Sequence, residues 1–414
     1  MTGRPLRAVA RLLLPLLLLP AAACTAVPFA DEPRPVTVLG PWTDAQADAF
    51  EDLLAESGVR FDYQGTAAQR EVLLSQVDAG AAPDLVVLPS PGELSEYAGQ
   101  GRLERLTGLY DPEAYGAPWT AGQDHPYWLP VKVDVKSLVW RRERTPEPHA
   151  PVDAGQWCVG MRDPGASGWP GSDWIEDILL QQSGPEAYAK WAAGDIPWTR
   201  GPAARAWRTW RAYLRGEAAA EALRQDYRGA PGENGLLFAG RGEPSCTLEH
   251  QGSFARALYD ERADEAVPGD SAPVLPGGPY ALRGREVSGD FAALFRRTPQ
   301  SERLLAFLLS KKGQESWPDR VPVLSARKDV SGGHEPGTVS AGLLGRLRDT
   351  GVPLCLDASD VMLPTMRDAF HEKVLLQLSL PDRDPDEVLG RLEELRLSLG
   401  RQGQRTVRHE QVCS

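Results

Sequence analysis

The chain is predicted to adopt an α/β fold, because short apolar runs alternate with helical patterns along its first hundred residues. Residues 36–39 have the pattern of a buried strand, residues 85–88 are a continuous apolar run, and residues 59–63 alternate apolar and polar side chains. A helical spacing of apolar side chains follows each run, and Gly58 and Gly80 stand where the first two helices would end. This order predicts a mostly parallel sheet flanked by helices.

The starts of these three helices are marked by hydroxyl side chains. Thr43, Thr66 and Ser90 each precede a Gln or Glu by three residues, which is the spacing of a capping box. Pro91 follows Ser90 at the first helical position. We therefore expect a helix after each strand.

A second α/β region is predicted to begin near residue 139. Expected strands are residues 157–161, 247–250 and 291–295, and expected helices are residues 173–182, 203–214, 298–309 and 386–399. Ser172 is positioned to cap the first of these helices. Trp207 and Trp210 share one helix and are predicted to be core residues.

The first 24 residues have the pattern of an export signal. Arg4, Arg7 and Arg11 precede an apolar run of residues 12–19, which is too short to span a bilayer. Three alanines then precede Cys24, an arrangement that resembles the lipobox of bacterial lipoproteins. We expect Cys24 to carry the lipid and to hold the protein at the outer face of the cell membrane. The alternative is an ordinary secretory signal with an incidental cysteine.

Composition excludes one class of partner. The 414 residues carry a formal net charge of −12, whereas nucleic acid needs a basic surface. The six histidines are scattered and no Cys-x-x-Cys is present, so nothing predicts a metal site. We expect no cofactor, no nucleic-acid partner and a monomer.

The remaining cysteines form an even set, as expected for disulfides in an exported protein. Four cysteines allow three pairings, and we expect Cys158–Cys246 and Cys355–Cys413. The second pair is the less secure prediction, because Cys413 lies in a polar C-terminal tail.

Several segments, in order, give the chain a family resemblance. They are GPWTDAQADAFEDLL, APDLVVLPSPGELSEYAGQGRLERL, WLPVKVDVKSLVW, CVGMRDPGASGWPGSDWIEDILL, GDIPWT, CTLEHQGSF, VSGDFAALFRRTP and LDASDVMLP. Together they cover nearly the whole chain after Cys24 and resemble the family 1 extracellular solute-binding proteins, the maltose-binding-protein-like receptors of sugar ABC transporters. The chain is similar above all to actinobacterial lipoprotein receptors for glucosides and related oligosaccharides.

The resemblance implies a type II periplasmic-binding-protein fold. Two lobes, each a mostly parallel sheet with flanking helices, would be joined by three crossovers at residues 132–138, 286–288 and 321–325, and would close on ligand by hinge motion. The expected divisions are a signal peptide (1–24), a tether (25–35), lobe 1 (36–135 and 287–322), lobe 2 (136–286 and 323–400) and a polar tail (401–414).

Ligand contacts are expected at the carboxyl ends of strands. Sugar rings need flat apolar faces, for which Trp42, Trp169 and Trp174 are the candidates, and planar acceptors for hydroxyl groups. The acceptor and donor candidates are Thr43, Asp44, Ser90, Asp134, Asp173, Glu176 and His250. For each Trp the alternative is core packing. Asp357 and Asp360 either bind hydroxyl groups of the ligand or begin a helix. Lys132 and Lys136 either contact the ligand or fix the hinge through ion pairs.

The expected function is therefore capture of a carbohydrate for delivery to ABC permease subunits, without catalysis. Three alternatives stay open at this point: a sugar-sensing receptor, a surface glycoside hydrolase with two carboxylates about 5–9 Å apart, and a receptor of the same fold for a polyamine or a phosphate ester.

Overall fold

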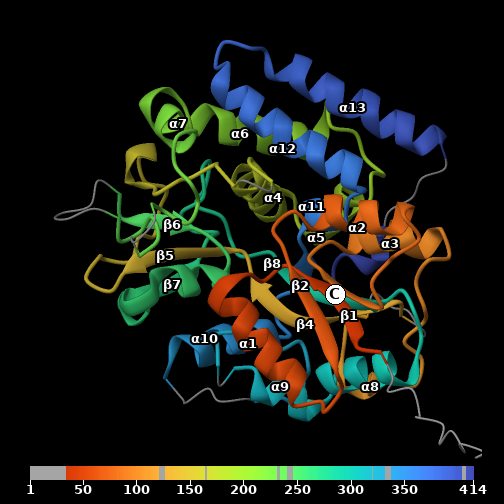
Figure 1. Ribbon diagram of the computed structural model, residues 1–414. Helices are drawn as coiled ribbons and strands as arrows, with labels where there is room; N and C mark the ends of the chain where they lie inside the picture. Colours follow the sequence, from red (N-terminus) through yellow and green to blue (C-terminus); the bar gives the residue numbers. More distant parts are fainter. Residues whose placement is uncertain are drawn as a thin grey trace, which may run out of the picture. The chain divides into compact units, whose positions relative to one another are not determined.

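Two β-sheets organise the chain in the computed structural model (Figure 1). The structure describes residues 34–120, 126–163, 166–230, 234–239, 246–318, 320–331, 337–402 and 407–414. Residues Pro35–Ser414 form one compact unit.

The larger sheet has the strand order β2-β1-β3-β8-β4, with β9 paired to β8. Its strands are β1 (Val36–Gly40), β2 (Phe61–Gly65), β3 (Leu85–Leu88), β4 (Trp128–Val135), β8 (Arg285–Leu294) and β9 (Leu354–Leu356). The first three run parallel, as predicted, whereas β8 is antiparallel to both β3 and β4. All four residues of β3 are buried, so helices cover both faces of the sheet there.

The smaller sheet has the order β6-β5-β7. Its strands are β5 (Leu138–Arg142), β6 (Leu248–His250) and β7 (Ala266–Asp270). Both pairings are antiparallel, so the expectation of a mostly parallel sheet in each lobe is wrong for this one.

Helices pack on both sheets (Figure 1). Those beside the larger sheet are α1 (Asp44–Ala55), α2 (Gln69–Asp78), α3 (Pro91–Gly99), α8 (Pro299–Leu308), α9 (Lys311–Ser316) and α10 (Val339–Arg348). The others are α4 (Trp169–Ser183), α5 (Pro185–Ala192), α6 (Gly201–Tyr213), α7 (Gly216–Ala222), α11 (Ala358–Val361), α12 (Pro364–Ser379) and α13 (Pro385–Arg401). Short 3-10 turns are η1 (Pro112–Ala114), η2 (Ala154–Gln156), η3 (Ser253–Glu265) and η4 (His409–Gln411).

We call the larger sheet with α1, α2, α3, α8 and α9 lobe 1, and the smaller sheet with α4–α7 and α11–α13 lobe 2. The three predicted crossovers lie side by side between them. Strand β4 runs directly on to β5, Asp134 pairs with Ser288 of β8, and Val133 forms a bridge with Leu324.

The lobes also touch where α3 meets α11. The Ser90 hydroxyl caps α3 and donates to the backbone oxygen of Asp360 at 2.8 Å. A Cβ added to Gly92 would lie 1.9 Å from the backbone oxygen of Met362, so only glycine permits this approach. The two lobes are in direct contact beside the cleft.

Three kinds of predicted local feature are wrong: one strand, one helix start and two helix caps. Residues 157–161 form no strand: Trp157 makes only an isolated bridge with Leu248, because the chain then turns towards α4. Helix α4 begins at Trp169, three residues before the expected cap, and the Ser172 hydroxyl donates back to the backbone oxygen of Trp169 at 2.9 Å. Thr43 and Thr66 precede α1 and α2, but neither helix shows a side-chain cap hydrogen bond.

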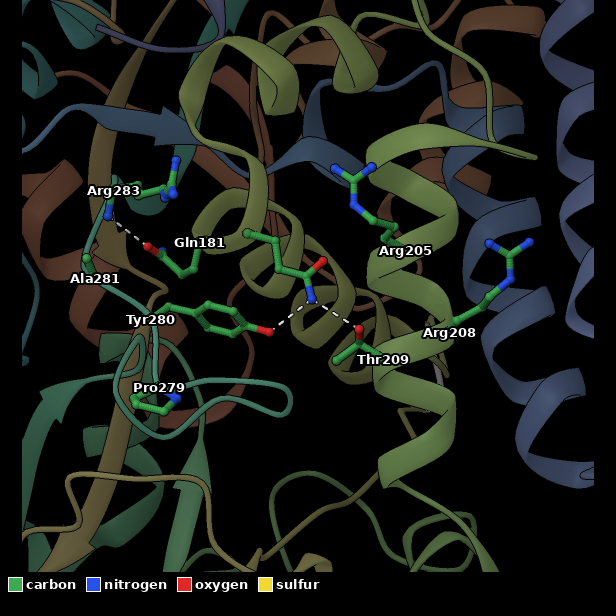
Figure 2. Close-up of a pocket in the computed structure, with 9 residues that line it drawn as sticks. Gln181, Arg205, Arg208, Thr209, Pro279, Tyr280, Ala281 and Arg283 are labelled. Atoms are coloured by element: carbon green, nitrogen blue, oxygen red, sulfur yellow. Dashed lines mark hydrogen bonds between the residues drawn. The ribbon is translucent and has the colours of Figure 1, made fainter.

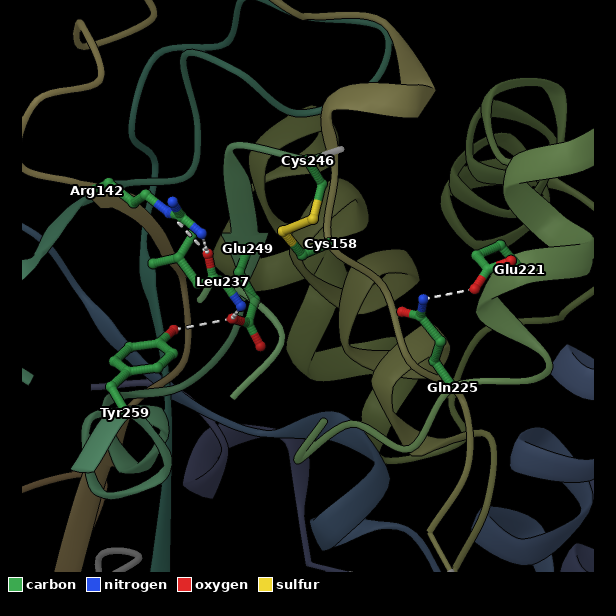
Figure 3. Close-up of a disulfide and its surroundings, with 8 residues drawn as sticks. All are labelled: Arg142, Cys158, Glu221, Gln225, Leu237, Cys246, Glu249 and Tyr259. Carbon is green, nitrogen blue, oxygen red and sulfur yellow. Dashed lines mark hydrogen bonds between the residues drawn. A yellow bond between two sulfur atoms is a disulfide. The ribbon is translucent and has the colours of Figure 1, made fainter. Parts of the chain in front are cut away.

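Both predicted disulfides are present. Cys158–Cys246 ties the segment before α4 to the residues preceding β6 (Figure 3). Cys355–Cys413 fastens the last residues to β9, where the backbone N–H of Leu356 donates to the oxygen of Val412 at 2.8 Å. Val412 is fully buried, so residues 407–414 are part of the folded unit, not the polar tail expected from the sequence.

The aromatic core lies mainly in lobe 2. Trp207 and Trp210 are fully buried, as predicted. Across the described ranges, no helix combines the length and apolar character needed to cross a bilayer. The predicted lipidation site, Cys24, lies outside the described residues.

Candidate functional site

A cavity of about 610 Å³ lies between the two lobes and takes side chains from both. Lobe 1 contributes Pro41, Ala67, Gln69, Arg70, Glu71, Leu88, Pro89 and Glu93. The crossing strands contribute Lys132, Asp134, Lys136, Ser288, Gly289 and Asp290. Lobe 2 contributes Asp163, Ala166, Ser167, Trp169, Asp173, Tyr227, Arg228, Phe254, Asp357, Ser359, Asp360, Arg367, Asp368, His371, Glu372 and Leu375.

The position of this cavity follows from the topology. Pro41 and Pro89 directly follow β1 and β3, whose parallel arrangement brings their carboxyl ends to one edge of the sheet. Loops at such an edge are where open α/β sheets place their ligands. The volume is that of an ordinary small-molecule site.

A lysine with two carboxylates forms the most buried charged group of the cleft. The Lys136 ammonium lies 2.7 Å from Asp173 Oδ2 and 2.9 Å from Asp357 Oδ2. Burial would lower the pKa of Lys136, but these carboxylates raise that pKa well above its ordinary value. Lys136 follows β4, Asp173 belongs to α4 and Asp357 precedes α11, so one ammonium ties together three parts of the chain.

The two carboxyls of this group titrate differently. Burial raises the pKa of Asp173 to about 6, against the opposing effect of Lys136. Burial acts on Asp357 too, but Lys136 and two hydrogen bonds, from the Ser359 hydroxyl and the Asp360 backbone N–H, outweigh it and hold the pKa of Asp357 at about 2. Near neutral pH the group Asp173–Lys136–Asp357 therefore has a net negative charge.

A third carboxyl, that of Glu176, lies next to Asp173 and Asp357. Glu176 Oε2 accepts hydrogen bonds from the backbone N–H groups of Ala358 and Ser359, at 2.7 and 3.1 Å. Carboxylate oxygens of Asp173, Glu176 and Asp357 lie within 4.8 Å of one another. Their chemistry would suit a cation, and the Lys136 ammonium already serves as one for two of the three. Burial and the neighbouring acids raise the pKa of Glu176 well above its ordinary value.

A second lysine group lies on the crossing strands. Lys132 Nζ is 2.7 Å from Asp134 Oδ2 and 3.4 Å from Asp290 Oδ2. The Ser253 hydroxyl donates to Asp134 Oδ1 at 2.7 Å and accepts from the Val135 backbone N–H at 3.1 Å. Asp134 therefore joins the lobe-2 turn at Ser253 to the hinge, while its carboxylate lines the cavity.

Aromatic faces come from lobe 2. Trp169 contacts Tyr227 edge-to-face, with ring centroids 4.8 Å apart, and Phe254 at 5.9 Å. The Trp169 indole N–H donates to Asp163 Oδ2 at 2.9 Å, which fixes the plane of its ring. All three rings line the cavity, so Trp169 stays the candidate for contact with a flat apolar ligand face.

Two of the predicted tryptophan contacts lie away from the cavity. Trp42 is buried in lobe 1 against Phe50 and Trp317, with ring centroids 4.5 and 4.9 Å apart, and offers no face to a ligand. Trp174 is buried against Trp157, because the inner side of α4 faces the lobe-2 core.

His250 is also enclosed in lobe 2. Its Nε2 lies 2.9 Å from Asp177 Oδ2, and its ring lies 5.0 Å from that of Trp174. Its role is therefore structural in this arrangement.

The polar residues predicted at the lobe-1 loops are also elsewhere. Thr43 and Asp44 are exposed at the start of α1 and do not line the cavity. Ser90 is buried and its hydroxyl is used by the helix cap and by Asp360. Of the ten tryptophan, acceptor and donor candidates predicted from the sequence, the cavity contains Asp134, Trp169 and Asp173.

Several lining residues were not predicted from the sequence. Tyr227 and Arg228 precede a Gly/Pro-rich segment, the same signal that pointed to Trp169. Phe254 follows immediately on the HQGS segment. Arg367 in the first turn of α12 and His371 in its middle also line the cavity, and nothing in the local sequence there indicates a cleft.

A second cavity, of about 620 Å³, lies within lobe 2 between α6 and the loop before β8 (Figure 2). Gln182 Nε2 donates to the Thr209 hydroxyl at 3.0 Å and to the Tyr280 hydroxyl at 2.9 Å. The exposed side chain of Arg208 pairs with Asp386. This cavity involves one lobe, and its described lining residues include no carboxylate, so the interlobe cleft is the stronger candidate.

Comparison with known proteins agrees with this architecture. A family model described as bacterial extracellular solute-binding protein matches residues 39–315. The chain is 28% identical to the alpha-glucosides-binding periplasmic protein AglE of Rhizobium meliloti (strain 1021), over 72% of this chain and 73% of that protein.

It is 27% identical to the osmoprotective compounds-binding protein GgtB of Synechocystis sp. (strain ATCC 27184 / PCC 6803 / Kazusa), over 86% of this chain and 90% of that protein. The solved structure of a chitin oligosaccharide binding protein superposes with a TM-score of 0.70 at 14% identity, covering 88% of this chain and 98% of that one.

Proposed function

The chain belongs to the bacterial extracellular solute-binding proteins, and we propose that it captures a carbohydrate and delivers it to an ABC importer. Members of this family bind solutes and do not transform them, so the protein is a receptor and not an enzyme. The hydrolase alternative is therefore not supported.

One observation carries the carbohydrate proposal. The indole face of Trp169 lies in the same cleft as the buried carboxylates of Asp173 and Asp357. A sugar ring has an apolar C–H face and a rim of hydroxyl groups, so it requires a flat aromatic surface and fixed planar acceptors together. AglE is named for alpha-glucosides and the superposed receptor for chitin oligosaccharides, and both of these ligands are carbohydrates, which supports the same class.

A binding screen tests this function. The full chain in detergent is titrated calorimetrically with mono-, di- and trisaccharides, beginning with α-glucosides because AglE is named for them. We expect saturable 1:1 binding to at least one glucoside. Absence of heat with every carbohydrate, together with binding of a phosphate ester or a polyamine, would contradict the proposal.

Membrane attachment is a separate part of the proposal. We propose that Cys24 receives a lipid and that the residues before Pro35 tether the folded unit to the outer face of the membrane, next to the permease. Metabolic labelling with an alkyne fatty acid should mark the wild-type protein and not Cys24→Ala. Equal labelling of both proteins would show that the lipid is attached elsewhere.

A further inference from the structure

The described cations that line the cleft are engaged by carboxylates. Lys132 and Lys136 form the two groups described above, and Arg228 lies 2.9 Å from Asp163 Oδ1. Arg70 and Arg367 both approach Glu93, at 3.3 and 3.9 Å. Within the described part of the chain, the cleft therefore has no cation left over for an anionic solute.

One carboxylate remains without a cation. Among the described cavity residues that are buried or half-buried, Asp360 alone is an acid with no ion pair within 4.0 Å. Its backbone is fixed on both sides, because its N–H donates to Asp357 Oδ1 and its oxygen accepts from Ser90. The helix start thus holds this carboxylate at the cavity, facing Asp357, Asp173, Lys136 and Arg367.

The electrostatic balance around Asp360 favours an added positive charge. Burial and the neighbouring Asp357 raise the pKa of Asp360 well above its ordinary value, more strongly than Lys136 and Arg367 lower it. A ligand cation at this place would relieve the repulsion among the carboxylates and would replace the proton on Asp360.

An independent feature lies in the same cleft. His371 is only 7% exposed, lines the cavity, and its Nε2 has no hydrogen-bond partner among the described residues. Burial, with a smaller contribution from Arg367, lowers the pKa of His371 to about 3, so the ring is neutral at physiological pH. In the neutral tautomer that carries its proton on Nδ1, the His371 Nε2 is an acceptor for an N–H group and does not repel a cation.

The cleft already stabilises one ammonium in this way. Lys136 Nζ lies 5.2 Å from the ring centroid of Trp169 and 5.9 Å from that of Phe254, between Asp173 and Asp357. Carboxylates combined with aromatic faces are surroundings that bind ammonium groups well. Asp360 and His371 line the same cavity as these aromatic residues, and they can offer a second ammonium a carboxylate and a nitrogen acceptor.

We propose that the solute carries a protonated amine, which binds the Asp360 carboxylate and the His371 Nε2 in the cleft, so that the carbohydrate is an amino sugar. This inference rests on the proposed carbohydrate function and specifies its substrate class.

Matched probes test the amine directly. The full chain is titrated at neutral pH with two pairs of compounds: β-1,4-linked glucosamine oligomers against their N-acetylated forms, and 1-deoxynojirimycin against D-glucose. In at least one pair the amine should bind tenfold or more tightly than its neutral partner. Equal or tighter binding of the neutral partner in both pairs would overturn the inference while leaving the carbohydrate function intact. If the chain bound neither partner of either pair and no α-glucoside, the proposed carbohydrate function itself would be contradicted.

Variants then assign the preference to its residues. Asp360→Asn should abolish the tenfold preference for the amine over its neutral partner. His371→Leu should reduce the preference about threefold. The matched control is Asp382→Asn, which removes the same charge from an exposed position outside the cleft and should keep the full preference. A preference that survives in Asp360→Asn would contradict the assignment, and the wild-type comparison decides the amine question even if that variant fails to fold.

Discussion

The two lobes present opposite kinds of surface to the cleft between them. Lobe 2 turns Trp169, Tyr227 and Phe254 towards the cavity, with the carboxylates of Asp173 and Asp357 beside them. Lobe 1 contributes prolines and flexible polar side chains, and its own loop tryptophan, at position 42, is enclosed by its core. From this difference we expect lobe 2 to hold the solute and lobe 1 to close over it.

The physical reason lies in the neighbours of each loop. Trp317, which follows α9, packs edge-on against Trp42 and fills the space on that side of β1. In lobe 2 the Trp169 ring is held at its edge by Tyr227 and by the bond to Asp163, which leaves a face towards the cavity. Variants in each lobe should separate these roles, with effects of decreasing size.

Replacing the lobe-1 tryptophan should affect stability and not binding. Trp42→Ala removes a buried indole from between Phe50 and Trp317, and such truncations cost about 3–5 kcal/mol. Urea unfolding should show this loss, while calorimetry should show ligand affinity within threefold of wild type. A tenfold loss of affinity without a loss of stability would reverse the roles of the two lobes.

Lobe 2 also contains a buried acid that is remote from the cleft, and it should give the protein a pH-dependent stability. Burial raises the pKa of Glu249 to about 8, against hydrogen bonds from the Tyr259 hydroxyl and the Leu237 N–H (Figure 3). Because the folded value exceeds the ordinary value of 4.5, the folded state holds this proton more tightly. The stabilisation that this group provides is therefore fully present below the pKa of Glu249 in the unfolded chain, and it is lost as the pH rises towards 8.

The expected loss from this group is on the order of 3 kcal/mol between about pH 5 and about pH 8, since each pKa unit corresponds to about 1.4 kcal/mol. Glu249→Gln keeps the shape without the titration and should flatten the pH profile of the free energy of unfolding. Ligand affinity should not change, because Glu249 does not line the cleft. An unaltered profile in the variant would assign the pH dependence to other groups.

Replacing the lobe-2 tryptophan, Trp169, should have the opposite result to replacing Trp42, because it should weaken ligand binding. Trp169→Ala removes a stacking face from the cavity and should weaken carbohydrate binding more than tenfold, or about 1.4 kcal/mol. Trp169→Phe is the conservative control and should recover part of the affinity, because it restores an aromatic face. Full affinity in Trp169→Ala would mean that the solute does not contact this side of the cleft.

Removing an ion pair across the cleft opening should have the smallest effect on ligand affinity. Arg70 in lobe 1 lies 4.0 Å from Asp368 of lobe 2, and both side chains are partly exposed. Partly exposed pairs of this kind contribute less than about 1 kcal/mol. Arg70→Gln should therefore change affinity by less than threefold, and by less still in high salt. A larger, salt-independent loss would show that Arg70 contacts the solute itself.

Local sequence patterns were sufficient for several elements of the fold, whereas the two-lobe arrangement was expected only from the family resemblance. The apolar runs located β1 and β3, the Ser90 cap located α3, and the even cysteine count with the chosen pairing predicted both disulfides. Each of these features is decided by side chains close in sequence or by covalent chemistry.

The binding residues were harder to predict, because long-range packing decides which side chains reach the cleft. Trp42 and Trp169 both stand in Gly/Pro-containing sequence at the start of a helix, and only their partners from residues 227 and 317 distinguish them. His371 faces the cavity from the interior of α12, where a periodic helix pattern gives no sign of a cleft. The early start of α4 similarly turned Trp174 into the core.

A crystal structure of the full chain with its bound carbohydrate would decide whether lobe 2 holds the solute. We predict a sugar ring stacked on Trp169 in the interlobe cleft, with hydroxyl or amine groups bonded to the carboxylates of lobe 2. A sugar bound in the single-lobe cavity of Figure 2, or against the lobe-1 loops with Trp169 bare, would contradict this assignment.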